Sequence, residues 1–326
     1  MNQFDIALPS NLEEALALLA DEDANAAPLA GGQDLLTELK EGLAAPATLV
    51  DLSKLEGMDA LEWGADGSLT LGPLVTLEQL ADDENVRTKL TVLAEAAESV
   101  ASPQIRSVGT LGGNLNQRPR CWYYRNEFAE CLKKGGSICY AKNGRNKYNA
   151  ILGGGPSYIV HPSDLAPALV ALDATVEITG PSGQREVAVE DFYYLPSEGP
   201  IAKETVLRDG ELVTAVRVPA QPAGLRSTYL KFKERASYDW ALSSVALAVA
   251  GPADAMTHAR LCLGGVAPKP WRTPGAEAAL TGAAIDEATI AKVREAALEG
   301  AQPLEENGYK IPLTQGLLTR ALQSLA

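Results

Sequence analysis

Two glycine-centred loops constrain the fold of this chain more than any other feature of its sequence. They read Leu29-Ala-Gly-Gly-Gln-Asp-Leu-Leu36 and Ser107-Val-Gly-Thr-Leu-Gly-Gly-Asn-Leu115, and each follows an apolar segment. Neither matches the GxGxxG or GxxxxGK(S/T) phosphate-binding patterns. Without a Cβ, successive glycine N–H groups can approach an anion and form a nest for it. The pair predicts two backbone cradles for one diphosphate, although Gly-Gly pairs also serve simply to close tight turns.

Short apolar runs alternate with capped leucine repeats around these loops. In the first half we predict strands at 4–8, 28–30, 48–52 and 69–74, and helices at 10–19, 35–43, 76–80 and 90–100. From 160 to 219 the pattern is β-rich, with strands at 174–178 and 213–218, and a Pro/Gly linker follows at 221–224. Beyond it lie strands at 227–233, 243–250 and 257–263, then helices at 274–280, 286–298 and 313–325. This order predicts a mixed first part and an α+β C-terminal domain, with the boundary near residue 222.

Length and charge exclude several classes of function. At 326 residues the chain is long enough for two or three domains. Its net charge of −14 argues against nucleic acid and against anionic membranes as partners. It has no apolar run long enough to span a membrane, and its first residues lack the pattern of a signal peptide. We therefore expect a cytoplasmic protein, while export together with a partner that carries a signal stays open.

The segment between the second glycine loop and His161 is rich in cysteine. Three of the four cysteines, Cys121, Cys131 and Cys139, lie there beside aromatic residues and glycines. One disulfide with a free thiol is one interpretation, but a reducing compartment disfavours it. Zinc is another, although only His161 could add a nearby ligand of suitable type. An iron–sulfur cluster is the third, since thiolates hold such clusters. The fourth cysteine, Cys262, lies in an apolar strand and is interpreted as a small core residue.

Six phrases, in register along the whole chain, resemble one family. They are Ala30-Gly-Gly-Gln-Asp34, Ile105-Arg-Ser-Val-Gly-Thr-Leu-Gly-Gly-Asn114, His161-Pro-Ser-Asp164 with the alanine-rich stretch after it, Gly210 to Pro219, Lys231-Phe-Lys-Glu-Arg235 and Leu263-Gly-Gly-Val-Ala-Pro268. Together they are similar to the flavin-binding medium subunit of the molybdenum hydroxylases. That family includes xanthine dehydrogenase, carbon monoxide dehydrogenase, aldehyde oxidoreductase and 4-hydroxybenzoyl-CoA reductase complexes.

The resemblance implies a fold and a domain plan. The fold class is α+β, with a two-part FAD-binding domain of the vanillyl-alcohol-oxidase/PCMH type and a smaller α+β C-terminal domain like that of carbon monoxide dehydrogenase flavoproteins. The expected FAD-binding domain is 1–221, with subdomains of about 1–55 and 56–221, and the C-terminal domain is 222–326. A cysteine insert is expected at 117–158.

The resemblance also implies which residues bind FAD. The diphosphate is expected at the glycine loops, through Leu29, Ala30, Gly31, Gly32, Gln33, Asp34, Leu35, Thr110, Gly112, Gly113 and Asn114. Asp34 could instead cap the helix after it. Asp164 matches a family aspartate that contacts FAD, and capping of the following helix is compatible with that role. Lys233 matches a lysine near the flavin and Leu212 an apolar contact to its ring, although a solvated lysine and a plain core leucine are the alternatives.

Some members of the family carry a [4Fe–4S] cluster in a cysteine insert at this place. Cys121, Cys131 and Cys139 match three of its ligands, but this chain has Ser157 where a fourth cysteine is expected. Serine oxygen is a harder and rarer ligand for iron than a thiolate. The resemblance thus predicts a cluster held by the three cysteines and Ser157, with the fourth ligand unresolved.

The function implied is that of an FAD-binding electron-transfer subunit. A large subunit with a molybdopterin cofactor would oxidise an aldehyde or N-heterocycle, a small [2Fe–2S] subunit would pass on the electrons, and FAD would deliver them to an acceptor. The alternatives are a stand-alone FAD-dependent oxidoreductase and a scaffold without flavin. With two histidines and no hydrolytic or phosphotransfer motif, the chain has little acid–base equipment to transform a substrate by itself. We interpret His161 as a structural histidine.

Overall fold

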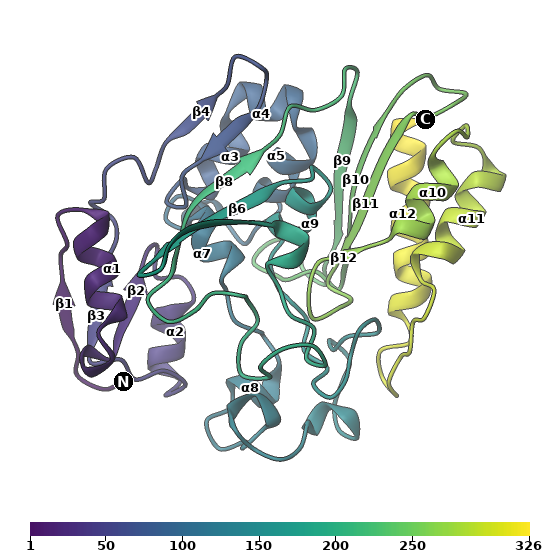
Figure 1. The fold of residues 1–326 in the computed structure, drawn as a ribbon. Coiled ribbons are helices and arrows are strands. Elements are labelled where there is room, and N and C mark those ends of the chain that lie inside the picture. The colour runs from purple at the N-terminus through teal and green to yellow at the C-terminus, as the bar shows by residue number, and fades with distance from the viewer.

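The computed structural model describes residues 1–326 as three sheets with helices packed around them (Figure 1). The first sheet is small and parallel, with the order β1-β3-β2. Its elements are β1 (Asp5–Ala7), α1 (Leu12–Ala20), β2 (Ala26–Leu29), α2 (Leu35–Lys40) and β3 (Thr48–Asp51). Asn11 caps α1 by accepting the N–H of Glu14 at 2.9 Å. The β2–α2 connection is the first glycine loop, so this unit holds one predicted cradle at the carboxyl end of a strand.

The second sheet has five antiparallel strands in the order β4-β5-β8-β6-β7. These strands are β4 (Leu61–Trp63), β5 (Leu69–Leu71), β6 (Thr175–Gly180), β7 (Gly183–Ala188) and β8 (Leu212–Val218). The helices beside it are α3 (Leu77–Asp82), α4 (Glu84–Lys89), α5 (Thr91–Glu98), α6 (Pro103–Arg106), α7 (Leu111–Leu115) and α9 (Leu165–Val170). Their apolar residues form the largest core of the protein. The second glycine loop connects α6 to α7 at one end of this core.

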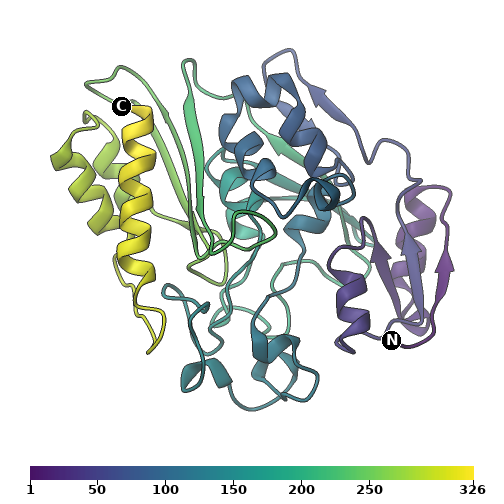
Figure 2. The ribbon, with the colours of Figure 1, turned by 180° about the vertical axis from the view of Figure 1, so that it is seen from behind.

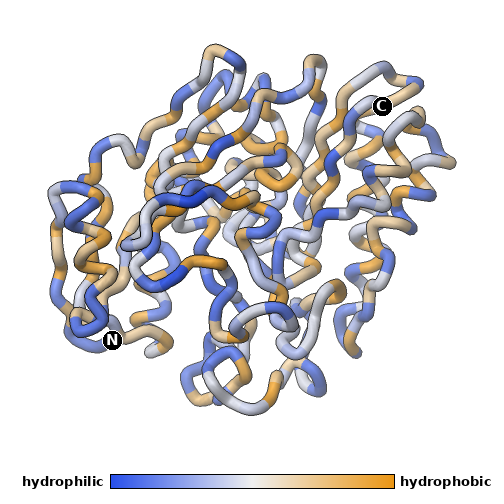
Figure 3. Tube along the Cα trace, viewed as in Figure 1, coloured by the Kyte–Doolittle hydropathy of each residue, from blue (hydrophilic) through white to orange (hydrophobic).

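The third sheet is antiparallel with the order β12-β11-β10-β9. It consists of β9 (Arg226–Phe232), β10 (Ser243–Ala250), β11 (His258–Gly264) and β12 (Trp271–Arg272). Every residue of β10 is buried, since α10 (Pro274–Leu280), α11 (Glu287–Ala297) and α12 (Lys310–Leu325) lie on one side and α5 and α9 on the other (Figures 1 and 2). The tube in Figure 3 shows the matching hydrophobic colour in the strands of this sheet. Cys262 of β11 is fully buried, which confirms its interpretation as a core residue.

The cysteine-rich segment, residues 117–158, forms a separate lobe (the cysteine lobe) between α7 and α9 in the chain, and Figure 1 shows it below the second and third sheets. It contains the short helix α8 (Trp122–Arg125) and two single turns at Leu132–Lys134 and Tyr140–Lys142. Its end is bonded to the stretch that leads into α12. Asn307 donates to the carbonyl of Asn149 at 3.1 Å, and the buried Lys310 donates to those of Tyr148 at 3.0 Å and Gly265 at 2.7 Å. The last part of the chain therefore closes the base of this lobe.

The predicted fold class, a two-part α+β domain followed by a smaller α+β domain, agrees with this arrangement. The predicted helices and strands occur, with shifts of a few residues at their ends. The sequence analysis does not predict β4, β7, β12, α4, α6, α7 or α8. The strand β7 is mostly polar, and the other six elements are at most six residues long. None of the helices is both long enough and apolar enough to cross a membrane.

Candidate functional site

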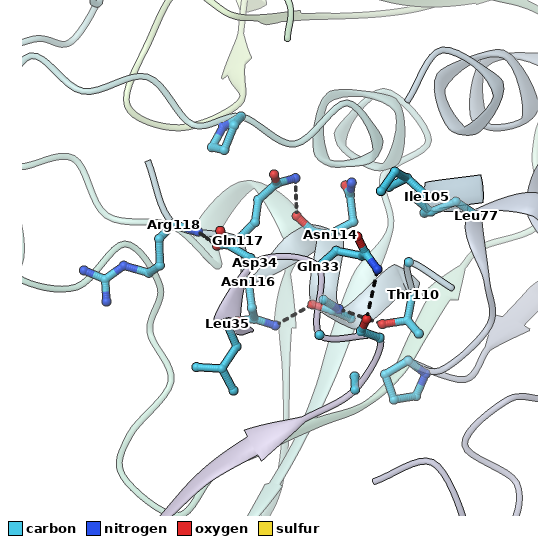
Figure 4. A pocket seen from close by; sticks show the side chains of 18 of the residues that line it. Gln33, Asp34, Leu35, Leu77, Ile105, Thr110, Asn114, Asn116, Gln117 and Arg118 are labelled. Carbon is cyan, nitrogen blue, oxygen red and sulfur yellow. Dashed lines mark hydrogen bonds between the residues drawn. The ribbon is translucent and has the colours of Figure 1, made fainter. Parts of the chain in front are cut away.

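Both glycine loops line one cavity of about 460 Å³ (Figure 4). It lies between the first sheet, the start of β8 and the helices α6 and α7. Twelve of the predicted FAD-binding residues line it: Ala30, Gly31, Gly32, Gln33, Asp34, Leu35, Thr110, Gly112, Gly113, Asn114, Asp164 and Leu212. Two predicted residues, Leu29 and Lys233, do not. The fold thus brings segments that are far apart in the sequence to one site.

The two loops touch each other, and glycine is what lets them do so. A Cβ placed on Gly31 would lie 2.1 Å from the carbonyl oxygen of Val108 in the second loop. Gly32 has a φ of +69°, a left-handed conformation that favours glycine. A Cβ on Gly113, in contrast, would meet only the Thr110 Oγ1 at 3.0 Å. Gly31 and Gly32 are therefore required by the backbone itself, whereas Gly113 leaves space on the cavity side.

The first loop presents a row of unused donors. The backbone N–H groups from Ala30 to Asp34 donate to no acceptor of the protein. In the second loop the N–H of Gly112 donates to Pro73 O at 2.8 Å and that of Asn114 to Thr110 O at 2.8 Å. The N–H of Gly113 donates to Thr110 Oγ1 at 3.2 Å. Because unpaired N–H groups in a cavity wall require a partner, the first loop is the stronger anion-binding element of the pair.

Asp34 forms ion pairs across the site and does not cap α2. Its Oδ1 lies 2.6 Å from Arg120 Nη1 and 2.8 Å from Arg125 Nη2. Its Oδ2 accepts the backbone N–H of Arg118 at 2.6 Å, as Figure 4 shows. All three arginines belong to the start of the cysteine lobe. The carboxylate of the first glycine loop therefore fixes that lobe to the cavity.

A second layer of charged groups extends this connection. Tyr124 donates to Glu38 Oε1 at 2.9 Å, and Arg125 also reaches Glu41 at 3.4 Å. Burial, and then the nearby Asp34, raises the pKa of Glu38, while the bond from Tyr124 acts in the opposite direction. Sequence reasoning missed this network, because arginines in a polar segment give no signal of their eventual partners.

Asp164 is almost fully buried at the wall of the cavity, and its side chain does not cap α9. Its Oδ1 accepts from Tyr229 at 2.7 Å, and its Oδ2 lies 2.7 Å from Lys231 Nζ. Lys233, just after the end of β9, donates to the carbonyl of Ser99 at 3.4 Å. Burial, and then the neighbouring Lys231, lowers the pKa of Lys233. The lysine paired with the site carboxylate is thus Lys231, which the sequence analysis did not single out.

Apolar and aromatic residues line the cavity beside its polar loops. Leu212 lines it and belongs to a small apolar core with Leu52 and Leu74. Tyr238 and Trp240, from the loop between β9 and β10, line it as well. A ligand with both a charged part and ring-shaped parts would match this combination of polar and apolar groups.

His161 is a buried histidine next to this site. It is fully buried and packs against Tyr193 with ring centroids 4.4 Å apart. Burial lowers the pKa of His161 to about 3, so the imidazole is neutral at physiological pH. This agrees with its interpretation as a structural histidine.

The cysteine lobe does not gather a complete set of metal ligands. Its three cysteines are all free thiols, and Ser157 is buried. An isolated β-bridge between Cys131 and Ile138 brings Cys131 close to the residue that precedes Cys139. Burial, and to a lesser degree the neighbouring Cys139, raises the pKa of Cys121. The structure contains no group of three or more His, Cys, Asp or Glu side chains placed to hold a metal ion. The predicted cluster therefore stays a prediction.

Comparison with known proteins places this site in a family. Residues 2–221 match the model of the FAD binding domain in molybdopterin dehydrogenase, and residues 227–325 match the CO dehydrogenase flavoprotein C-terminal domain. The chain is 38% identical to the aldehyde oxidoreductase FAD-binding subunit PaoB of Escherichia coli K12, over 96% of this chain and 95% of that protein. It is 30% identical to the carbon monoxide dehydrogenase medium chain of Afipia carboxidovorans, over 98% of this chain and 96% of that protein.

A solved structure agrees with these matches. The reconstituted CO dehydrogenase from Oligotropha carboxidovorans contains a chain with a TM-score of 0.78 and 27% identity, covering 99% of this chain and 97% of its own. The chain described here belongs to the family of FAD-binding subunits of molybdenum hydroxylases. This confirms the family prediction and its assignment as the flavoprotein subunit of an oxidoreductase.

Proposed function

We propose that the row of free N–H groups from Ala30 to Asp34 holds the diphosphate of FAD. This row is the observation that carries the proposal, because five successive donors without a protein acceptor, on residues that line one cavity, match an anion with several acceptor oxygens. Thr110 and Asn114 would complete the cradle from the second loop. Leu212 and Trp240, which both line the cavity, would contact ring systems of the FAD. Asp34 and Asp164 would support FAD binding indirectly, because they fix the positions of the arginines and the lysine with which they form ion pairs.

We further propose the roles of the remaining predicted residues and the extent of each domain. Leu29 and Leu35 would shape the first loop, Gly112 and Gly113 would leave room beside the phosphates, and Lys233 would favour a reduced, anionic flavin from a distance. The FAD-binding domain would comprise 1–221, with subdomains of about 1–55 and 56–221, and the C-terminal domain 222–326.

The bound FAD would relay electrons within a larger complex. Flavin can take up electrons singly from an iron–sulfur centre and release them as a pair. The proposed partners are a large subunit with a molybdopterin cofactor and a small [2Fe–2S] subunit. An aldehyde or an N-heterocycle is the proposed substrate class, since the most similar relative reported above is a subunit of an aldehyde oxidoreductase. The role of this chain is to bind and orient the flavin between donor and acceptor.

Gly113 offers a direct test of FAD binding. Purified protein should carry about one non-covalent FAD per chain. In Gly113→Val the added side chain would project toward the phosphates with little backbone conflict, so the protein should fold but lose its flavin. The control is Gly316→Ala in α12, where a Cβ meets nothing within 4 Å. Flavin content and circular dichroism are measured together, and a folded wild-type chain without extractable FAD would overturn the proposal.

Co-purification tests the proposed complex. The chain should isolate with both partner subunits, and by itself it should show only slow dye reduction and no turnover of aldehydes or purines. Robust turnover of an organic substrate by the isolated chain would instead establish the stand-alone oxidoreductase.

We also propose that the cysteine lobe can bind a [4Fe–4S] cluster through Cys121, Cys131, Cys139 and Ser157. The support is the residue types: three thiols lie in one lobe, and thiols left without a partner are prone to oxidation. Binding of the cluster would have to draw the four side chains together from their present positions. Its test is the iron and sulfide content of anaerobically prepared protein, with about four of each expected per chain.

Variants separate the cluster from its fourth ligand. Cys131→Ala should remove the iron while leaving FAD bound, and Ser157→Cys should retain or strengthen it. Iron-free wild-type protein, or a native disulfide between two of these cysteines, would exclude the cluster. An unchanged cluster in Ser157→Ala would exclude only Ser157 as a ligand.

A further inference from the structure

A second cavity of about 320 Å³ lies directly beside the first. The two share a wall of four residues, Arg120, Pro162, Asp239 and Trp240, which line both. The far side is built by the cysteine lobe and by the loop between β9 and β10. Its size is at the lower end of the range for small-molecule sites. A ligand held here would therefore be a near neighbour of whatever occupies the first cavity.

Aromatic rings form much of the wall. Trp122, Tyr123, Tyr148 and Trp240 all line the second cavity, although the chain has only four tryptophans and ten tyrosines in total. Trp122 and Tyr148 meet edge to face, with ring centroids 5.3 Å apart. Such walls favour a flat ring as ligand, because aromatic faces and edges stack with it.

Cationic side chains stand among these rings. Arg145 and Lys147 line the cavity and are each paired with a carboxylate, with Glu306 at 2.7 Å and Glu234 at 2.5 Å respectively. Their side chains are 71% and 42% exposed, so the cavity reaches solvent on this side. Because the cations are paired, the resting cavity is close to neutral. It is thus suited to a neutral ring whose polar edge can accept hydrogen bonds from the cations.

Two polar atoms at the cavity lack a partner. The Nε2 atom of His161, a residue that is 4% exposed, is buried and has no hydrogen-bond partner. The same holds for the Nε atom of Arg120. Unsatisfied buried polar atoms are rare and often mark a missing ligand or water. Of the three lobe cysteines only Cys121 lines this cavity, so it is not the place where the three thiols would meet.

We propose that the second cavity binds the electron acceptor, and that this acceptor is a quinone. The proposal rests on the proposed function, in which FAD occupies the first cavity. A quinone combines a flat ring with carbonyl oxygens that match the aromatic and cationic walls. FAD held at the first cavity, in its anionic reduced form, would supply a hydride, which is two electrons and one proton. One proton from solvent would complete the hydroquinone, so atoms and electrons balance.

Duroquinone is a suitable probe, because its ring is fully substituted and offers no free position to a thiol such as Cys121. Equilibrium dialysis measures its binding to the full chain, both FAD-loaded and flavin-free. Trp122→Ala should weaken binding about two- to tenfold in both forms, as expected for the loss of one aromatic partner. Phe128→Ala is the control, since Phe128 is an 87% exposed aromatic residue of the same lobe that does not line the cavity. Lys147→Gln provides a second variant, and it should also weaken binding.

The outcomes separate this proposal from the one on which it rests. Duroquinone binding that both cavity variants weaken and Phe128→Ala leaves unchanged supports the site. A chain that retains FAD but does not bind duroquinone, or binds it equally well in all variants, overturns the acceptor site and leaves the flavoprotein intact. A chain that binds duroquinone at this site but never retains FAD overturns the proposed function and, with it, the role of the ligand as an electron acceptor.

Discussion

Replacing Asp34 with asparagine tests the connection between the first glycine loop and the cysteine lobe. The wild-type carboxylate contacts two guanidinium groups, at 2.6 and 2.8 Å, and one backbone N–H at 2.6 Å. Asparagine keeps the shape and one acceptor oxygen but removes the negative charge. Arg120 and Arg125 would then lose their shared counter-ion in a site where water cannot fully replace it.

The cost follows from how deeply these groups are buried. The side chains of Asp34, Arg120 and Arg125 are 15%, 21% and 11% exposed. Removing one partner of a buried pair typically costs about 3–5 kcal/mol, whereas exposed pairs contribute about 0–1 kcal/mol. Glu38 and Glu41 remain near Arg125 and compensate in part. For Asp34→Asn we therefore expect a loss of about 2–3 kcal/mol in the free energy of unfolding.

Urea denaturation of the flavin-free chain measures this loss, and titration with FAD measures the effect on the site. FAD affinity should fall at least about tenfold, since a loosened loop no longer aligns its N–H groups on one anion. Asp209→Asn is the matched control, because Asp209 is 95% exposed and its pair with Lys203 is a surface pair. It should change stability by less than about 0.5 kcal/mol. Equal stability of the two variants, with unchanged FAD affinity in Asp34→Asn, would refute the reasoning.

Two further predictions concern single residues. Gly31→Ala should destabilise the chain and abolish FAD binding, because the alanine Cβ would lie 2.1 Å from Val108 O. Gly316→Ala should instead stabilise the chain by about 0.5–1 kcal/mol. Thermal melts that rank the two variants the other way would contradict this. Burial lowers the pKa of Lys310 to about 7, far below the value of about 10.4 in an unfolded chain. Between pH 7 and 10 the unfolded chain thus binds a proton that the native state lacks, so this group favours the native state at high pH and loses that contribution as the pH falls. Lys310→Met should reduce the slope of unfolding free energy against pH by up to about 1.4 kcal/mol per pH unit, and an unchanged slope would show that Lys310 does not titrate there.

The sequence predicts the local parts of this structure well, and the reason is physical. Asn11 caps a helix of leucines, and β10 is a continuous apolar run, so short-range pattern and tertiary burial agree. The glycines of both loops were found because glycine is needed where backbones come close. For the same reason most of the predicted FAD-binding residues line one cavity.

What the sequence could not predict depends on contacts between distant segments. Lys231 in β9 and Lys233 just after it have the same side-chain chemistry, and only the packing of Asp164 beside β9 decides which one forms the ion pair. The partners of Asp34 lie more than eighty residues away in the chain. No periodicity or local composition encodes such pairings, because they follow from how complete elements pack.

The bonds from Asn307 and Lys310 to the base of the cysteine lobe have a consequence for biosynthesis. On the ribosome the N-terminal end of a chain emerges first, and the lobe is made long before these two residues. The carbonyls of Tyr148 and Asn149 at the base of the lobe therefore lack these two donors until Asn307 and Lys310 have left the exit tunnel. Translation that stops just before α12 would produce a chain whose first sheet is complete but whose lobe is open. The cysteine lobe can therefore complete the hydrogen bonds at its base only after the last part of the chain has been made.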